Sequence, residues 1–143
     1  MRRIALLLAC LTTLPAQALD FRSVGTAAAI LYDGPSTGSQ QLFVVNRGFP
    51  LEVVTTHGKW GRVRDPVGKL AWIELDSLSA TRTVLVRKAS DAHLAADTAS
   101  PVCAHVRAGV LLPYLGMSAN GWARVRLPDQ RTAYITLDAL WGA

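Results

Sequence analysis

An internal repeat constrains the fold of this 143-residue chain more than any other sequence feature. Residues 60–78, WGRVRDPVGKLAWIELDSL, align without a gap to residues 122–140, WARVRLPDQRTAYITLDAL, at a constant offset of 62. Ten of the nineteen positions are identical, beginning with Trp60 and Trp122. Self-similarity of this length indicates that one structural unit of about sixty residues occurs twice in tandem.

Each copy contains short apolar runs separated by turn-forming residues. Runs rich in Val, Ile, Leu, Trp and Tyr between Gly, Pro, Asn and Asp predict short antiparallel strands. We expect strands near residues 28–32, 41–45, 51–56, 59–64 and 70–74, and again near 83–87, 101–106, 110–116, 121–126 and 132–136. Upstream of the clear repeat, residues 29–32 align loosely with residues 83–86.

Local patterns predict faces and turns within the first copy. Alternation along the strands places Val63, Ala71 and Ile73 in the core and leaves Trp60 and Trp72 partly toward solvent. Residues 65–69, Asp-Pro-Val-Gly-Lys, predict a tight turn. Residues 75–78 and their repeat predict a short closing helical turn, with Asp76 and Asp138 as its capping residues.

The N-terminus has the features of a secretory signal peptide. Two arginines follow Met1, an apolar stretch covers residues 4–14, and Pro15-Ala16-Gln17-Ala18 provides a small-residue cleavage pattern. The apolar stretch is shorter than the ~20 residues of a membrane-spanning helix. We therefore predict cleavage after Ala18 and a periplasmic or secreted protein without a transmembrane segment; lipid attachment at Cys10 is the alternative. The predicted domains are residues 19–80 and 81–143.

Charge and cysteine content narrow the classes of partner. The chain has 15 Lys and Arg against 10 Asp and Glu, and removal of Arg2 and Arg3 with the signal leaves 13 against 10, or about +3. No dense basic patch is present, so we do not expect nucleic-acid binding. Cys103 is the one cysteine of the mature chain, which excludes an internal disulfide framework.

One pair of residues suggests chemistry. Cys103 and His105 are two residues apart and would share a strand face, as a thiol nucleophile and its base must. A lone cysteine more often packs as a small apolar residue. His57, His93 and His105 lack the spacing of a zinc site, so we expect neither metal nor cofactor.

The repeated pattern Gly-x-Trp-x-x-Val, followed by a glycine turn, an Ala-Trp/Tyr-Ile strand and a closing Leu, resembles the bacterial SH3-like domains of exported proteins. The resemblance extends over residues 24–141 and includes both copies. It implies an all-β fold of two tandem small SH3-like barrels, each with about five antiparallel strands. It also implies binding of cell-wall peptides in a groove floored by aromatic side chains.

The same resemblance selects the candidate binding residues. Trp60 matches the tryptophan of the groove, Tyr32 and Asp33 match a Tyr-Asp pair at its edge, and Trp122 is the equivalent tryptophan of the second copy. Val86 and Arg87 replace Tyr-Asp there, so the groove is expected in the first copy. Trp72 and the repeated Arg62 and Arg124 complete the predicted ligand surface, although outward-facing arginines also occur simply as solvated surface.

We therefore predict a non-catalytic binding or scaffolding module that recognises a cell-envelope peptide, peptidoglycan or a protein partner. Two alternatives remain open: a thiol enzyme that uses Cys103 and His105, and a purely structural envelope subunit. The identity of the ligand and the oligomeric state do not follow from the sequence.

Overall fold

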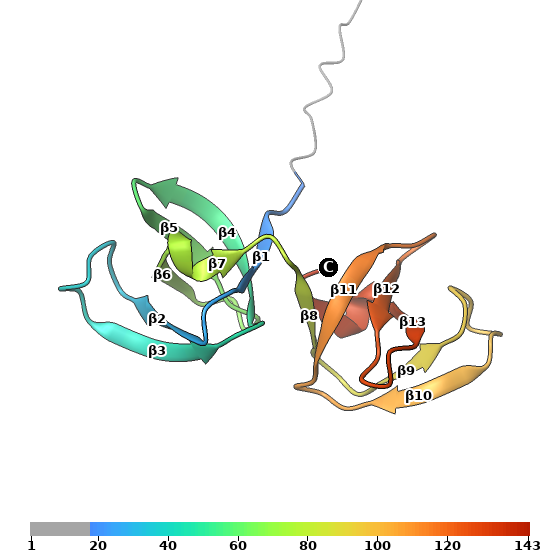
Figure 1. The fold of residues 1–143 in the computed structure, drawn as a ribbon. Helices are drawn as coiled ribbons and strands as arrows, with labels where there is room; N and C mark the ends of the chain where they lie inside the picture. The colour runs from blue at the N-terminus through green and yellow to red at the C-terminus, as the bar shows by residue number, and fades with distance from the viewer. Residues whose placement is uncertain (1–17) are drawn as a thin grey trace, which may run out of the picture.

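The computed structural model describes residues 18–143; the predicted signal peptide, apart from Ala18, lies outside the described residues. Within residues 18–143 the strands form two antiparallel sheets of seven strands each, drawn on the two sides of Figure 1. This confirms the predicted all-β fold class and is consistent with two small SH3-like domains. We call strands β1–β7 the N-terminal unit and strands β8–β14 the C-terminal unit.

The N-terminal unit contains short strands and one 3-10 turn: β1 (Phe21–Val24), β2 (Ala28–Tyr32), β3 (Gln41–Asn46), β4 (Pro50–His57), β5 (Trp60–Arg64), β6 (Leu70–Glu74), η1 (Leu75–Ser77) and β7 (Leu78–Ser79). The C-terminal unit has the same series: β8 (Thr83–Val86), β9 (Ser90–His93), β10 (Val102–Val106), β11 (Leu111–Met117), β12 (Trp122–Arg126), β13 (Thr132–Thr136), η2 (Leu137–Ala139) and β14 (Leu140–Trp141).

The two units have the same topology. The strand order is β3-β2-β6-β5-β4-β1-β7 in one sheet and β10-β9-β13-β12-β11-β8-β14 in the other. The pairing register also repeats: Tyr32 lies opposite Trp72 where His93 lies opposite Tyr134. Even the irregularities coincide, since the strand pair β2–β3 and the strand pair β9–β10 each skip one residue, Leu42 and Cys103 respectively. The repeat in sequence is therefore a repeat of strand pairing.

The structure corrects the upstream part of the sequence alignment. Val24 N donates to Phe49 O at 3.0 Å, and Val86 N donates to Val110 O at 2.9 Å, so β8 is the counterpart of β1 and not of residues 29–32. The counterpart of β2 is β9, which the sequence did not predict because Ser-Asp-Ala-His lacks an apolar run. Strands β1, β7 and β14 were also missed. Val86 and Arg87 consequently do not replace Tyr32 and Asp33.

Each unit has its own apolar core. Val63, Ala71 and Ile73, the three predicted core residues, are buried, and Ile73 has no exposed surface. The buried residues of the N-terminal cluster are Val24, Ala29, Leu31, Val45, Leu51, Val53, Val63, Ala71 and Ile73. The C-terminal cluster consists of Val84, Val86, Ala92, Val106, Leu112, Ala123, Val125, Leu127, Ala133, Ile135, Ala139 and Leu140.

The tight turn at residues 65–69 forms as predicted, but the predicted helix caps do not. Asp65 Oδ1 accepts the backbone N–H groups of Val67 at 3.0 Å and Lys69 at 2.8 Å. The N-cap positions of η1 and η2 are occupied by Glu74 and Thr136, and neither side chain makes a capping hydrogen bond. The predicted capping aspartates, Asp76 and Asp138, lie two residues after these N-cap positions, because the apolar residue before each aspartate already belongs to the 3-10 turn.

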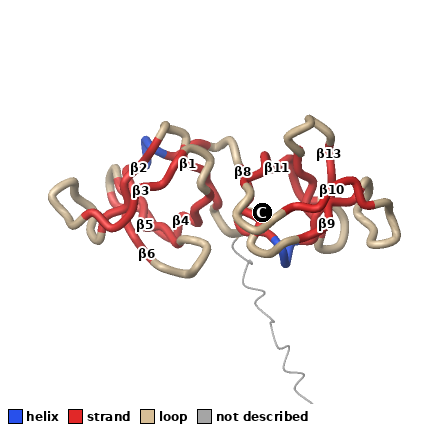
Figure 2. The backbone as a smooth tube through the Cα atoms, turned by 90° about the horizontal axis from the view of Figure 1, so that it is seen from below, coloured by secondary structure: helices blue, strands red, loops and turns tan. Residues whose placement is uncertain are grey.

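The two units lie side by side and contact each other through partly buried polar groups (Figures 1 and 2). Ser23 Oγ, in β1, accepts the backbone N–H of Thr83 at 2.9 Å, and the two hydroxyl groups are also 2.9 Å apart. Trp141 Nε1 donates to Pro50 O at 3.1 Å, and the Trp141 ring meets Phe21 edge to face. These contacts indicate that the units pack against each other in a defined orientation.

Candidate ligand-binding grooves

Strands β2, β6 and β5 are neighbours, and they bring the candidate residues of the N-terminal unit together. Tyr32 lies opposite Trp72, and Trp72 lies opposite Arg62 on its other side. Directly opposed residues project from the same face of a sheet, so these three side chains form one row. Trp60 is two residues before Arg62 and faces the same way. The structure thus places all of these residues on one surface.

Tyr32 and Trp60 form the aromatic centre of this surface. Their ring centroids are 5.4 Å apart and the rings are nearly perpendicular, at 87°. Such edge-to-face contacts add about 0.5–1.5 kcal/mol beyond simple burial. Tyr32 is buried and Trp60 half-buried, so Trp60 presents the accessible aromatic surface. Asp33 is exposed, and its Oδ1 accepts the backbone N–H of Gln40 at 2.9 Å, which holds the β2–β3 loop closed.

The C-terminal unit carries an equivalent row that sequence reasoning missed. His93 lies opposite Tyr134, and Tyr134 lies opposite Arg124. The His93 ring meets the Trp122 ring edge to face, with centroids 5.3 Å apart at 86°. His93 therefore takes the place of Tyr32. In the sequence, His93 lies 61 residues after Tyr32. This correspondence can be recognised only once β9 is known to be a strand.

The His93 ring is held in one orientation. Its Nδ1 lies 2.9 Å from Ser100 O, and because a carbonyl oxygen only accepts, Nδ1–H is the donor. The neutral imidazole therefore carries an unprotonated Nε2, which can accept a hydrogen bond. Tyr32 has no such acceptor nitrogen. The two units thus present different polar groups on the same aromatic framework.

A concave site lies beside the tryptophan in each unit. The N-terminal groove, of about 310 Å³, is lined by the β2–β3 loop, Lys59, Trp60 and Glu74. The C-terminal groove is larger, at about 640 Å³. It is lined at equivalent positions by Thr98, Trp122 and Thr136, so the two grooves correspond.

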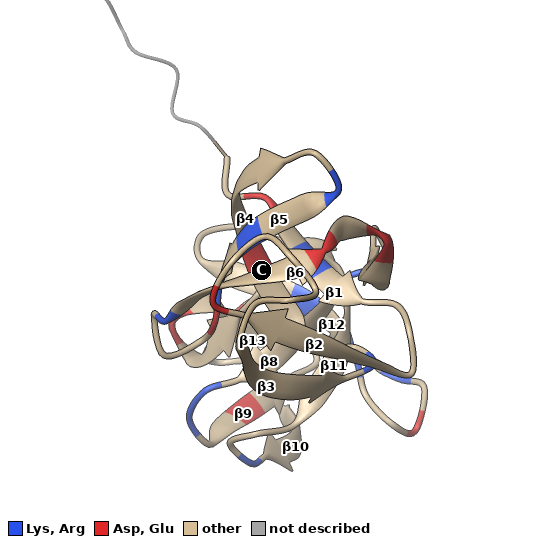
Figure 3. Ribbon diagram, turned by 90° about the vertical axis from the view of Figure 1, so that its left-hand side faces the viewer, with Lys and Arg blue, Asp and Glu red and all other residues tan. Residues whose placement is uncertain are grey.

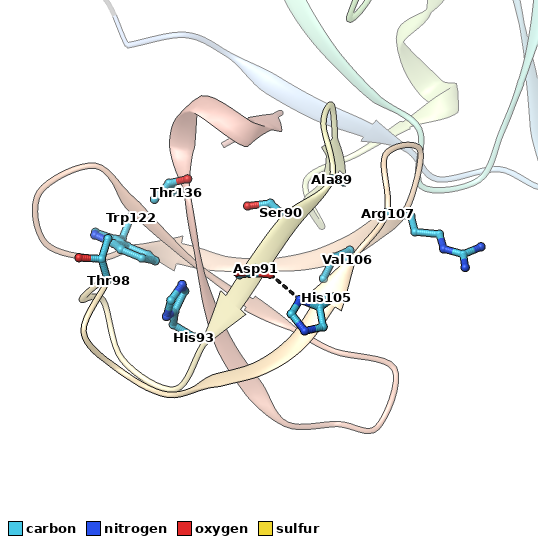
Figure 4. A pocket seen from close by; sticks show the side chains of 10 residues that line it. All are labelled: Ala89, Ser90, Asp91, His93, Thr98, His105, Val106, Arg107, Trp122 and Thr136. Atoms are coloured by element: carbon cyan, nitrogen blue, oxygen red, sulfur yellow. Dashed lines mark hydrogen bonds and ion pairs between the residues drawn. The ribbon is translucent and has the colours of Figure 1, made fainter.

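The C-terminal groove continues along β9 and β10, as Figure 4 shows. His93 and Trp122 lie at one end, and Asp91, His105 and Arg107 lie toward the other. His105 Nδ1 donates to Asp91 Oδ1 at 2.5 Å. The groove therefore offers an aromatic surface at one end and groups of both charge signs at the other. The sequence had favoured the first copy, but the C-terminal unit has the larger concavity.

The two predicted arginines differ from the tryptophans in setting. Arg62 and Arg124 are exposed at the centres of β5 and β12, and neither lines the grooves described above. Arg124 reaches back toward Leu115 O, at 3.5 Å.

Trp122 is more buried than Trp60, with 7% of its surface exposed. Its indole therefore forms the floor of the groove, while Trp60 forms part of the wall.

Cys103 and His105 point to separate partners. Cys103 Sγ donates to Ala92 O at 3.3 Å and packs against the C-terminal core, while His105 is exposed and bound to Asp91. Strand β10 is irregular at Cys103, which breaks the alternation that would place the two residues on one face. Cys103 also occupies the position of Leu42 in the other unit. This geometry is that of a packing residue.

Residues 18–143 lack two further features. In this range no helix is long and apolar enough to cross a membrane. The same residues contain no cluster of three or more His, Cys, Asp or Glu side chains placed to hold a metal ion.

A comparison of the sequence with known protein families agrees with the geometry of the N-terminal unit. Residues 26–79 match the family model described as a bacterial SH3 domain. The match includes β2 to β7 and therefore the aromatic row of the N-terminal unit. No curated protein sequence matches the chain.

The solved structures to which this chain is similar include NlpC2 and NlpC1 from Trichomonas vaginalis, at 18% and 17% identity, each with a TM-score of 0.40. These alignments cover 88% and 96% of this chain and 49% and 50% of those chains. An NlpC/P60 family protein from Bacillus cereus is 16% identical, with a TM-score of 0.39, over 85% of this chain and 56% of that one. The chain thus spans about half the length of these proteins.

Proposed function

We propose that this protein is a non-catalytic binding module of the cell envelope that recognises cell-wall peptides through the tryptophan grooves. The observation that carries the proposal is the repeated edge-to-face pair, Tyr32–Trp60 and His93–Trp122, beside a concave site in each unit. A concave site beside an aromatic pair, with a few polar groups around it, is typical of peptide recognition. The match of residues 26–79 to the bacterial SH3 domain supports the same ligand class.

The C-terminal groove is the main binding site in this proposal. A peptide that carries both carboxylate and ammonium groups finds counter-charges in Arg107 and Asp91, while Trp122 contacts its apolar portions. The N-terminal groove is smaller and offers Lys59 and Glu74 for the same purpose. Two linked sites that bind weakly raise the overall affinity for a polymer such as peptidoglycan.

The test compares groove-blocking variants at equivalent positions. Thr136→Lys and Glu74→Lys each place a long side chain beside one tryptophan, opposite Trp122 and Trp60 respectively. Thr132→Lys and Val67→Lys are matched controls at exposed positions outside both grooves. Binding of soluble cell-wall peptides is measured by calorimetry, and retention on purified peptidoglycan by sedimentation.

We expect Thr136→Lys to weaken peptide binding at least tenfold, Glu74→Lys to weaken it less, and the controls to bind like the native protein. A hot-spot position typically costs more than about 1 kcal/mol when it is disrupted. Failure of the native protein to bind either ligand contradicts the proposal. Equal losses in the groove and control variants would also contradict it, because the effect would then not be local.

The envelope location is part of the proposal and has its own test. Cleavage after Ala18 leaves Leu19 as the N-terminal residue, and lipid attachment leaves a modified Cys10. Mass spectrometry of the protein recovered from an envelope fraction distinguishes the two products. A chain that retains Met1 in the cytoplasmic fraction contradicts export.

A further inference from the structure

His93 gives the C-terminal groove a polar group that the N-terminal groove lacks. The edge-to-face pairs beside the two grooves, Tyr32–Trp60 and His93–Trp122, have almost the same geometry, with ring planes at 87° and 86°. The two pairs differ in the polar atoms of the ring that meets the tryptophan. That ring carries a phenol hydroxyl in the N-terminal unit and two imidazole nitrogens in the C-terminal unit.

One imidazole nitrogen of His93 is used within the protein. Nδ1 donates to Ser100 O at 2.9 Å, in the loop that joins β9 to β10. The same loop is closed by two further hydrogen bonds, from Leu94 N to Pro101 O at 3.1 Å and from Ala95 N to Ser100 Oγ at 3.0 Å. The orientation of the ring is therefore set by a loop that is itself held in place.

The other imidazole nitrogen, Nε2, is open to a ligand. His93 is half-buried, and its Nε2 has no hydrogen-bond partner within residues 18–143. In that range the one buried side-chain nitrogen or oxygen without a partner is Arg82 Nε, so His93 Nε2 is accessible to solvent. His93 lines the C-terminal groove, and Figure 4 shows its ring next to the Trp122 indole. Because Nδ1 carries the hydrogen of the neutral ring, Nε2 is an acceptor.

The groups that can ionise near His93 come from its own strand and from the segments around it. They are Asp91 on β9, His105 on β10, Arg107 directly after β10, and Tyr134 on β13. Trp122, on β12, has no ionisable group, and Asp97, in the β9–β10 loop, does not line the groove. Asp91 is the acidic residue of β9, whose red segment Figure 3 shows, and its Oδ1 accepts from His105 Nδ1 at 2.5 Å. One carboxylate oxygen is thus already used, whereas His93 Nε2 is open.

We propose that His93 is a specificity-determining residue of the C-terminal groove: its Nε2 accepts a backbone N–H of the bound peptide, while Trp122 contacts the adjoining apolar part. This inference rests on the proposed peptide-binding function. Protonation of the ring converts Nε2 from an acceptor into a donor, so that a donor of the groove meets a donor of the ligand. The groove therefore selects ligands that present an N–H beside Trp122, and it binds them through the neutral form of His93.

The expected pH dependence follows from the fraction of neutral imidazole. An ordinary histidine side chain is about nine-tenths neutral at pH 7.5 and about one-tenth neutral at pH 5.5. The apparent affinity of a ligand that requires the neutral ring falls with that fraction, so it should bind about tenfold more weakly at the lower pH. A phenol keeps its proton over the same range. The N-terminal unit, with Tyr32 at this position, lacks this mechanism.

The test measures binding of a synthetic cell-wall stem peptide, built of alanine, glutamate and lysine, by calorimetry at the two pH values. Every chain carries Glu74→Lys, which blocks the N-terminal groove, and this single variant is the reference. We expect the dissociation constant of the reference to rise about tenfold at pH 5.5. His93→Phe keeps a ring against Trp122 but lacks Nε2, so it should bind at both pH values as weakly as the reference does at pH 5.5. His105→Gln removes the other histidine of the groove and should keep the tenfold rise.

The outcomes separate this inference from the proposed function. Equal binding by the reference at the two pH values overturns the role of His93 and leaves peptide binding intact. A rise that persists in His93→Phe, or that is lost in His105→Gln, also overturns it, because another group then titrates. No binding at either pH overturns the proposed function and this inference with it. Circular dichroism verifies that each variant is folded.

A measurement without ligand tests the acceptor directly. Nitrogen-15 NMR of the native mature chain at pH 7.5 distinguishes the two neutral tautomers of each histidine, and His93→Phe identifies the His93 signals. We expect the form with hydrogen on Nδ1, as the bond to Ser100 O requires. The form with hydrogen on Nε2 would overturn the proposal, because the groove would then present a donor at this position.

Discussion

The N-terminal and C-terminal units share a strand order and a register but differ in what occupies equivalent positions. Where the N-terminal unit has the cross-strand pair Ile30 and Val44, the C-terminal unit has Asp91 and His105. Tyr32 is likewise replaced by His93. The backbone pairing has been kept while the exposed face of β2–β3 has diverged. We infer that the fold depends on the core pattern, and that the outer faces were free to acquire different tasks.

The largest expected effects test whether the two cores are equivalent. Ile73 and Ile135 are fully buried at equivalent positions. We expect Ile73→Ala and Ile135→Ala each to lower the free energy of unfolding by about 3 kcal/mol, since each leaves a cavity in a closely packed core. Urea unfolding followed by tryptophan fluorescence measures both. A loss below ~1 kcal/mol in either variant shows that its core relaxes around the cavity.

The next prediction tests the contact between the units. Gly142 has φ of +100°, and a Cβ there would lie 2.9 Å from Pro50 Cβ and from Thr83 O. We expect Gly142→Ala to cost about 2–3 kcal/mol, from backbone strain together with the overlap.

Gly109→Ala is the matched control for this variant. Gly109 has a similar φ of +89° but open space around its Cβ position. It should therefore lose only the strain contribution, about 1 kcal/mol. Equal thermal shifts for the two variants would show that the inter-unit contact adds nothing to stability.

A smaller expected effect concerns the ion pair between Arg64 and Glu52 in the N-terminal unit. Arg64 NH1 donates to Glu52 Oε2 at 2.7 Å, and the Glu52 side chain is only 10% exposed. Arg126, the equivalent arginine, instead contacts Gln130 O at 3.3 Å. We expect Arg64→Gln to cost about 1–2 kcal/mol, because a buried carboxylate loses its partner, whereas Arg126→Gln stays within about 0.5 kcal/mol. Denaturant midpoints measured in parallel check this difference.

The smallest effect concerns an exposed ion pair of the C-terminal unit. A hydrogen bond from Lys88, at 2.6 Å, holds the pKa of Asp138 below its ordinary value. A lowered folded-state pKa contributes stability above the ordinary pKa, and this is lost as the pH falls through the lowered value. We expect Lys88→Ala to raise the pKa of Asp138, as measured by NMR titration of its carboxyl group. An unchanged pKa would mean that the pair does not persist in solution.

Sequence reasoning succeeded where the repeat is strong. The segments from Trp60 and Trp122 onward predicted β5, β6, β12, β13 and the turn at residues 65–69. It failed at β9, because Ser90–His93 is polar and is a strand only through its partners β10 and β13. That failure led to the wrong counterpart for Tyr32. The aromatic role of His93 was missed for the same reason.

By itself, the sequence determined the duplication, the all-β class and the core positions Val63, Ala71 and Ile73, because periodic apolar residues are a local property of the chain. Only the tertiary structure decided which strands are edges, which residue faces Trp122, and how Trp141 and Gly142 contact the first unit. These features depend on groups that are distant in sequence, such as Trp141 Nε1 and Pro50 O. A local sequence pattern does not predict a contact whose partner lies in the other half of the chain.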